Sequence, residues 1–209
     1  MCYDAAMSAV SVPKDKMSVA AFHAWALVQP QGRYELVAGD VVAMAPERQR
    51  HVVVKGNVFR ALQDAVRRAK LPCTVFTDGV SVVIDDETSY GPDTVVECGS
   101  ALNLDSVTVA NPLIVVEVTS PSSERQDTTS KAADYMTVAS IAHVLIIDAA
   151  KKRVIHHERG LAGVFLTRSL READTLRLTP PGIEVAVAAL FEDVCRPASA
   201  KPCSPGTSA

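Results

Sequence analysis

Two carboxylates stand in or beside apolar stretches that would ordinarily form buried strands. Asp93 follows the Gly91-Pro92 turn and precedes the apolar pair Val95-Val96, while Glu117 ends the longer apolar run "NPLIVVE". A buried carboxylate is costly unless something neutralises it. If both acids met at one edge of a sheet, they would form an oxygen-lined site of the kind that Mg²⁺ prefers. Taken singly, each acid also fits a structural role: Asp93 could cap a turn, and Glu117 could pair with a surface arginine.

A lysine follows these acids in the segment "ERQDTTSKAADY". Asp127, Lys131 and Tyr135 are spaced i, i+4 and i+8, so a helix over residues 127–137 would stack them along one side. Because this helix follows the strand that carries Glu117, Lys131 could point back at the acid pair. A lysine beside metal-bound carboxylates can orient a water nucleophile or stabilise negative charge on a phosphate. An ordinary Asp–Lys pair on a solvated helix face explains the same spacing.

The elements that would position these residues indicate an α/β fold with a mixed sheet. Ser18 is placed to cap a first helix, and residues 33–44 predict a hairpin that turns at Ala38-Gly39. Residues 50–70 predict a long amphipathic helix, because apolar residues recur at helical spacing. These residues are Val54, Val58, Leu62, Ala65, Val66 and Ala69.

The second half of the chain adds strands and one crossover. Strands at 73–78 and 80–85 are separated by Asp78-Gly79, which predicts a hairpin. The strand at 113–118, the helix at 127–137 and the strand at 143–148 predict a parallel crossover. A closing hairpin over 152–170 and a short helix at 185–193 are expected to complete the domain.

The composition limits the classes of protein to which this chain can belong. The chain has 209 residues, of which 48% are hydrophobic and 22% charged, which suits one globular domain and excludes a disordered chain. A net charge of −3 argues against a strongly basic nucleic-acid binder. We find neither a run of about 20 apolar residues nor a signal-peptide core, so we expect a cytoplasmic protein without a membrane segment. Residues 1–16 are interpreted as an extension, 17–195 as the domain and 196–209 as a disordered tail.

The five cysteines are scattered and form no C-x-x-C pair. We therefore expect neither a zinc site nor a disulfide framework. Cys73 and Cys98 are interpreted as small core hydrophobes, and the remaining cysteines as thiols of the tails.

Four segments, in order, resemble the Uma family of proposed restriction endonucleases, within the PD-(D/E)XK nuclease superfamily. The segments are "RYELVAGDVV", "YGPDTVV", "IVVEVTSPSSERQDTTSKAADY" and "HVLIID", and the resemblance spans about residues 17–193. It implies a restriction-endonuclease-like fold, in which helices flank a mixed central sheet with a divalent-metal site at one edge. The implied activity is that of an endodeoxyribonuclease.

The resemblance assigns roles to the residues already singled out. Pro92-Asp93 matches the "PD" of the superfamily and Glu117 its second acid. The superfamily lysine would stand two residues after Glu117, where this chain has Thr119. In the Uma family this lysine is on the following helix, which points to Lys131.

Further matches extend the candidate site. Glu35 matches the acid of the "YEL" segment and would be an additional ligand of the metal or of water. His51, at the start of the long helix, and Asp127 and Tyr135, on the later helix, are weaker candidates. The family's aromatic pair in the "HVLIID" strand is replaced by Val144-Leu145, a departure that concerns packing.

The resemblance implies a mechanism in which Asp93, Glu117 and Glu35 hold Mg²⁺ or Mn²⁺ while Lys131 positions the attacking water. DNA would be the substrate, and cleavage of both strands would favour a homodimer. Two alternatives remain. One is a catalytically silent fold that binds nucleic acid or protein, and the other is a metal-dependent phosphodiesterase acting on small substrates.

Overall fold

The computed structural model describes residues 12–194 except 30, 100 and 120–124, and only the backbone of residues 125–129 and 162. Most of residues 1–16 and all of 196–209, the expected extension and tail, therefore lie outside the described residues. Within the described part, Lys16 contacts the turn of the first hairpin, since its Nζ donates to the Ala38 carbonyl oxygen at 2.6 Å. The boundaries of the domain stay predictions.

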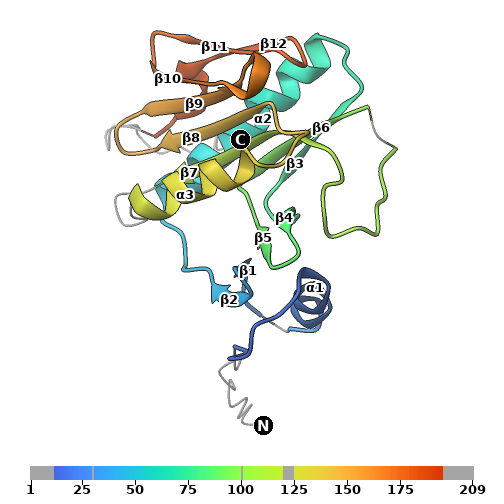
Figure 1. Cartoon of the computed structure of the whole chain (residues 1–209). Coiled ribbons are helices and arrows are strands. Elements are labelled where there is room, and N and C mark those ends of the chain that lie inside the picture. The colour runs from blue at the N-terminus through green and yellow to red at the C-terminus, as the bar shows by residue number, and fades with distance from the viewer. Residues whose placement is uncertain (1–11, 30, 100, 120–124, 195–209) are drawn as a thin grey trace, which may run out of the picture.

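A six-stranded sheet forms the centre of the molecule (Figure 1). Its strand order is β10-β9-β8-β7-β6-β3, and only β7 and β8 run parallel. The mixed sheet and the parallel crossover are therefore confirmed. The strands are β3 (Cys73–Thr77), β6 (Thr94–Cys98), β7 (Pro112–Thr119), β8 (His143–Asp148), β9 (Arg153–Arg159) and β10 (Phe165–Arg171).

Helices cover the two faces of this sheet, with α3 (Arg125–Tyr135) in front and α2 (Gln49–Arg68) behind in Figure 1. The apolar stripe of α2 packs on one face, and five of its six predicted positions are buried, Ala69 being exposed. On that face β11 (Thr175–Leu178), β12 (Ile183–Ala186) and the 3₁₀-helix η2 (Val187–Phe191) complete the core. A second core lies under α3 on the opposite face. The predicted C-terminal helix is thus a strand followed by a 3₁₀-helix.

A smaller sheet of order β2-β1-β5-β4 lies beside the central one, next to α1 (Val19–Leu27). Its strands are β1 (Tyr34–Val37), β2 (Asp40–Ala43), β4 (Val82–Asp85) and β5 (Thr88–Tyr90). The predicted Ser18 cap is confirmed, because its side chain accepts a hydrogen bond from the Ala21 N–H. The predicted hairpin is also confirmed, with Ala38 and Gly39 both at positive φ, as its tight turn requires.

Two further predictions from local sequence are wrong. Asp78-Gly79 does not close a hairpin, because β3 pairs with β6 in the central sheet whereas β4 pairs with β5 in the small sheet. Gly79 does turn the chain, at φ 109°, but the turn sends it from one sheet to the other. Cys73 and Cys98 are not free core thiols, because they form a disulfide between directly opposed residues of β3 and β6.

No helix in the described part of the chain is long and apolar enough to cross a membrane.

Candidate active site

The ends of β6 and β7 bring the two predicted acids together. Thr94 pairs with Val116, so the same antiparallel register continued by one residue sets Asp93 opposite Glu117. The junction is fixed by hydrogen bonds, since the Asp93 N–H donates to the Val116 oxygen at 3.0 Å. Asp93 Oδ2 in turn accepts a bond of 2.6 Å from the Val118 N–H. Asp93 is thus buried at the point where β6 begins.

Glu35 and Lys131 form an ion pair that joins the small sheet to α3. Lys131 Nζ lies 2.8 Å from Glu35 Oε1 and 2.7 Å from Oε2. Glu35 Oε1 also accepts a bond of 3.1 Å from the Gly91 N–H, in the turn that leads to Asp93. The ammonium lies 5.0 Å from the centroid of the Tyr90 ring, a cation–π contact. Both predicted residues therefore lie at the end of the sheet where Asp93 is located.

Glu117 points toward α3 and meets a phenol there. The Tyr135 hydroxyl donates to Glu117 Oε1 at 2.7 Å. Burial raises the pKa of Glu117 to about 8; nearby Asp93 and Glu35 add to the rise, and Lys131 and the Tyr135 bond oppose it. Burial, followed by the charge of Glu117, also raises the pKa of Tyr135, so the phenol stays a donor. Asp93 and Glu35 therefore lie close enough to Glu117 to disfavour its charge, and Lys131 offsets this only in part.

Helix α2 contacts Asp93 from the other side of the sheet. Lys55 Nζ lies 2.9 Å from Asp93 Oδ1, and His51 Nε2 lies 3.3 Å from Oδ2. Burial acts to raise the pKa of Asp93, but the bond from His51 and the charge of Lys55 outweigh it and lower the pKa. Asp93 is consequently ionised at neutral pH. With a pKa of about 8, most Glu117 side chains are instead protonated at that pH.

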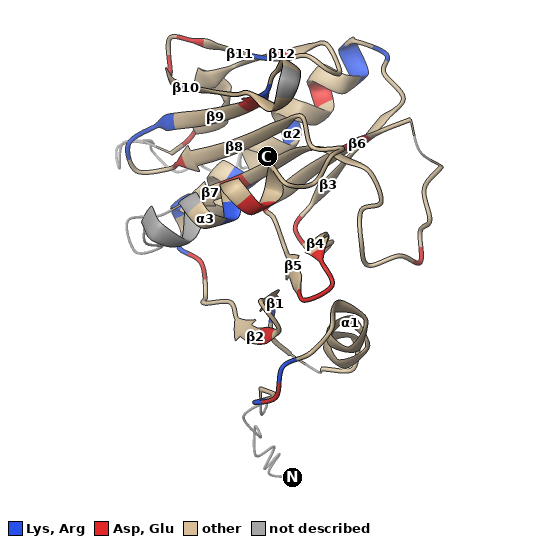
Figure 2. Cartoon of the chain, viewed as in Figure 1, with Lys and Arg blue, Asp and Glu red and all other residues tan. Residues whose placement is uncertain are grey.

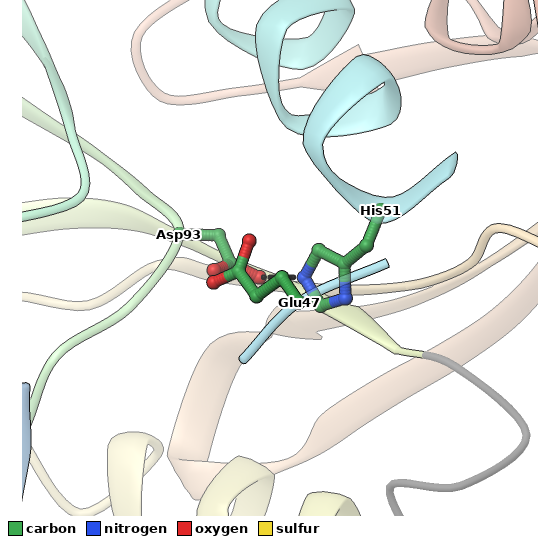
Figure 3. Close-up of side chains that lie close together, drawn as sticks. All are labelled: Glu47, His51 and Asp93. Carbon is green, nitrogen blue, oxygen red and sulfur yellow. Dashed lines mark hydrogen bonds and ion pairs between the residues drawn. The ribbon is translucent and has the colours of Figure 1, made fainter. Parts of the chain in front are cut away.

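Asp93 also belongs to a second group of possible metal ligands. Glu47, His51 and Asp93 place one donor atom each within 4.8 Å of one another, an arrangement that could hold a metal ion (Figure 3). Glu47 and Asp78 both accept hydrogen bonds from Lys55 Nζ, at 2.8 and 2.6 Å. The opposing charges, Asp93 first, outweigh the effect of burial and raise the pKa of Lys55.

Sequence reasoning missed three residues of this group: Glu47, Lys55 and Asp78. Lys55 had a usable signal, because it follows His51 by one helical turn on α2 and so lies on the same side. Glu47 and Asp78 lie in loops outside any periodic pattern. Of the weaker candidates, His51 and Tyr135 lie in the site, whereas the side chain of Asp127 is outside the described residues.

A cavity of about 560 Å³ opens beside the site, lined by residues 47–51 and by Ala149 and Ala150. Arg48 and Arg50, both exposed residues, are among those that line it. Glu47 and His51 belong to both the cavity and the donor group around Asp93.

Comparisons with known proteins show the family and the fold of the chain. A crystal structure titled as "a putative nuclease belonging to DUF820" from Anabaena variabilis ATCC 29413 is similar, with a TM-score of 0.70 and 12% sequence identity. The match covers 86% of this chain and 99% of that chain, and at this identity it shows the fold alone. No curated protein matches the sequence. The model of the Uma2 family, described as "Putative restriction endonuclease", matches residues 19–188. The match spans most of the chain, and the chain therefore belongs to the Uma2 family.

Proposed function

We propose that the protein is a metal-dependent endonuclease that hydrolyses DNA phosphodiester bonds at Asp93, Glu117, Glu35 and Lys131. The observation that carries this proposal is the meeting of residues from β1, the start of β6, β7 and α3 at one end of the central sheet. Membership of a family described as restriction endonucleases supports the reaction class.

The acids fit a hard divalent cation. Asp93, Glu117 and Glu35 supply only carboxylate oxygens, the donors that Mg²⁺ and Mn²⁺ prefer. Asp93 and Glu35 each contribute to the raised pKa of Glu117, which means that their charges repel a charged carboxylate at that position. A cation among them would relieve this repulsion. Bound Mg²⁺ or Mn²⁺ would polarise the phosphate and lower the pKa of a coordinated water.

The residues of the chain would position the reactants around that ion. Asp93 is held ionised by His51 and Lys55, and is thereby ready as a ligand. Lys131 is fixed by both oxygens of Glu35, so its ammonium can orient the attacking water and offset negative charge that develops on the phosphate. Tyr135 fixes one oxygen of Glu117 and leaves the other for the metal. No other side chain is needed for this scheme.

DNA is the proposed substrate because the cavity beside the acids carries cations. Arg48 and Arg50 could contact backbone phosphates on either side of the scissile one. Elsewhere the charges are mixed, and the turn between β4 and β5 is acidic (Figure 2). Because the net charge of the protein is −3, DNA binding should depend on this local contact and should weaken steeply with added salt.

A second candidate function is a catalytically silent nuclease-like fold that binds nucleic acid or a protein. One observation favours it: Lys55 and Lys131 already neutralise Asp93 and Glu35 without any metal. Under this alternative the acids would serve the fold, and divalent ions would neither stabilise the protein nor support cleavage.

Nicking of supercoiled plasmid in Mn²⁺ or Mg²⁺ separates the two functions. We expect the wild type to nick, and Asp93→Ala and Glu117→Gln to lose activity while remaining folded by circular dichroism. Glu97→Gln is the matched control, because Glu97 is a buried glutamate of β6 whose Oε1 binds the Asn111 N–H instead. Wild-type protein that neither nicks nor melts higher with Mn²⁺ would favour the silent fold, and an active Glu117→Gln would show that the site is wrong.

A further inference from the structure

Lys55 is buried among three carboxylates on the side of Asp93 that faces α2. Its Nζ lies 2.6 Å from Asp78, 2.8 Å from Glu47 and 2.9 Å from Asp93, and only 9% of its side chain is exposed. A lysine in the polar edge of an amphipathic helix ordinarily extends into water. Here the ammonium instead has one acid for each of its three N–H donors.

Two of these three acids belong to the group that could hold a metal. Glu47 and Asp93 are two of the three residues whose donor atoms lie within 4.8 Å of one another. Lys55 binds Glu47 through Oε1 and Asp93 through Oδ1, so its ammonium lies between these two side chains. A divalent ion bound to both would sit about 2.0–2.2 Å from each oxygen, within a few ångströms of Nζ. Two cations cannot share that space without strong repulsion.

We propose that the ammonium of Lys55 is a built-in cation that occupies the position of a second divalent ion between Glu47 and Asp93. The inference rests on the proposed function, because it concerns how many ions the site accepts. Asp93 Oδ1 then contacts the internal cation through one lone pair and keeps the other for the metal that it shares with Glu117, because Oδ2 is occupied by the Val118 N–H and His51. The site takes one divalent ion where two would otherwise fit.

The surrounding charges support a permanent cation at this position. Arg33 bridges Glu47 and Asp78 at 3.1 and 3.0 Å, so two fixed cations face three acids. Without Lys55, three carboxylates would face Arg33 alone, and His51 would be the remaining partner of Asp93 on this side. The space left by the ammonium would be lined by carboxylate oxygens and would carry negative charge, and both favour binding of a divalent ion.

Counting Mn²⁺ ions bound per chain tests the proposal. The electron paramagnetic resonance signal of free Mn²⁺ gives the count at equilibrium. We expect Lys55→Met to bind one more ion than the wild type, and Lys55→Arg, which keeps the charge, to match the wild type. Lys152→Met is the control, because it removes a lysine from an ion pair with Glu172 outside the site. Equal counts for Lys55→Met and wild type overturn the proposal.

The wild-type count tests the proposed function separately. At least one bound Mn²⁺ supports metal-dependent catalysis, and none would remove its basis. The difference between Lys55→Met and wild type still decides the role of Lys55 in either case. Failure of the proposal on Lys55 is therefore distinguishable from failure of the proposed function.

A further variant keeps the proposal falsifiable if Lys55→Met does not fold. With Lys55 in place, Glu47 is not a metal ligand, so Glu47→Gln should change the Mn²⁺ dissociation constant by no more than about twofold. Loss of a direct or supporting ligand typically weakens metal binding about 10–100-fold. A loss of tenfold or more in Glu47→Gln would place the ion at Glu47 despite Lys55 and overturn the proposal.

Discussion

Replacing Glu117 with glutamine should stabilise the metal-free protein by an amount that grows with pH. Burial raises the pKa of Glu117 from an ordinary value of 4.5 to about 8, a difference of about 3.5 pH units. At about 1.36 kcal/mol per unit, keeping the carboxylate ionised at high pH costs the folded state about 5 kcal/mol. Glu117 retains some solvent contact, so this figure is an upper limit. Glutamine keeps an oxygen for the Tyr135 hydroxyl and removes the charge.

The direction of the effect follows from proton binding. Below pH 4.5 the carboxyl group is protonated in both the folded and the unfolded state, and Glu117 contributes no pH dependence. Between pH 4.5 and about 8 the unfolded state releases this proton while the folded state keeps it, so the free energy of unfolding falls as pH rises. Above pH 8 the effect is constant. The difference between variant and wild type should therefore rise from near zero to at most about 5 kcal/mol.

Urea unfolding in EDTA at pH values from 4.5 to above 8 measures this difference. Subtracting the wild-type curve removes the contributions of other groups, which both proteins share. One of them is His156, whose pKa is lowered to about 4 by burial and by His143, with an effect of opposite slope. A Glu117→Gln difference that is independent of pH, or a variant less stable than wild type at pH 8, would refute the reasoning.

Three further changes have defined outcomes. Lys131→Met leaves Glu35 buried without its ammonium, so it should lose about 3–5 kcal/mol of stability in urea and all plasmid nicking, while Mn²⁺ still raises its melting temperature; retained nicking would contradict its role. His156 should contribute a fall of about 3 kcal/mol in the free energy of unfolding as pH drops from 6.5 to 4, opposite in sign to the contribution of Glu117, because its buried neutral ring resists protonation; the difference between wild type and His156→Gln isolates this contribution, and a difference independent of pH would exclude it. Replacing Cys73 and Cys98 with serine should cost about 3 kcal/mol, since the disulfide closes a loop with a sequence separation of 25; dithiothreitol should destabilise the wild type equally and leave the variant unaffected.

The sequence by itself determined most of the helices and strands and singled out the acids that the structure brings to one end of the central sheet. The apolar spacing of α2 and the order of strand, helix and strand at β7, α3 and β8 are local patterns, and the structure contains all of them. The placement of Asp93 and Glu117 at neighbouring strand ends was also readable, because a carboxylate in an apolar run is unusual. Helical spacing allowed Lys131 to face the acids, and the resemblance to the Uma family selected it over an ordinary Asp–Lys pair on a solvated face.

Only the tertiary structure decided which segments pair. The Asp78-Gly79 turn carries a hairpin signal, but β3 and β4 each found a more distant partner, so the turn joins two sheets instead. The Cys73–Cys98 disulfide follows from the same long-range pairing of β3 with β6. Glu47 and Lys55 approach Asp93 because α2 packs across the sheet from the side opposite α3. Local spacing determines the face on which a side chain lies, whereas its charged partner depends on which elements pack together, and that information is spread over the whole chain.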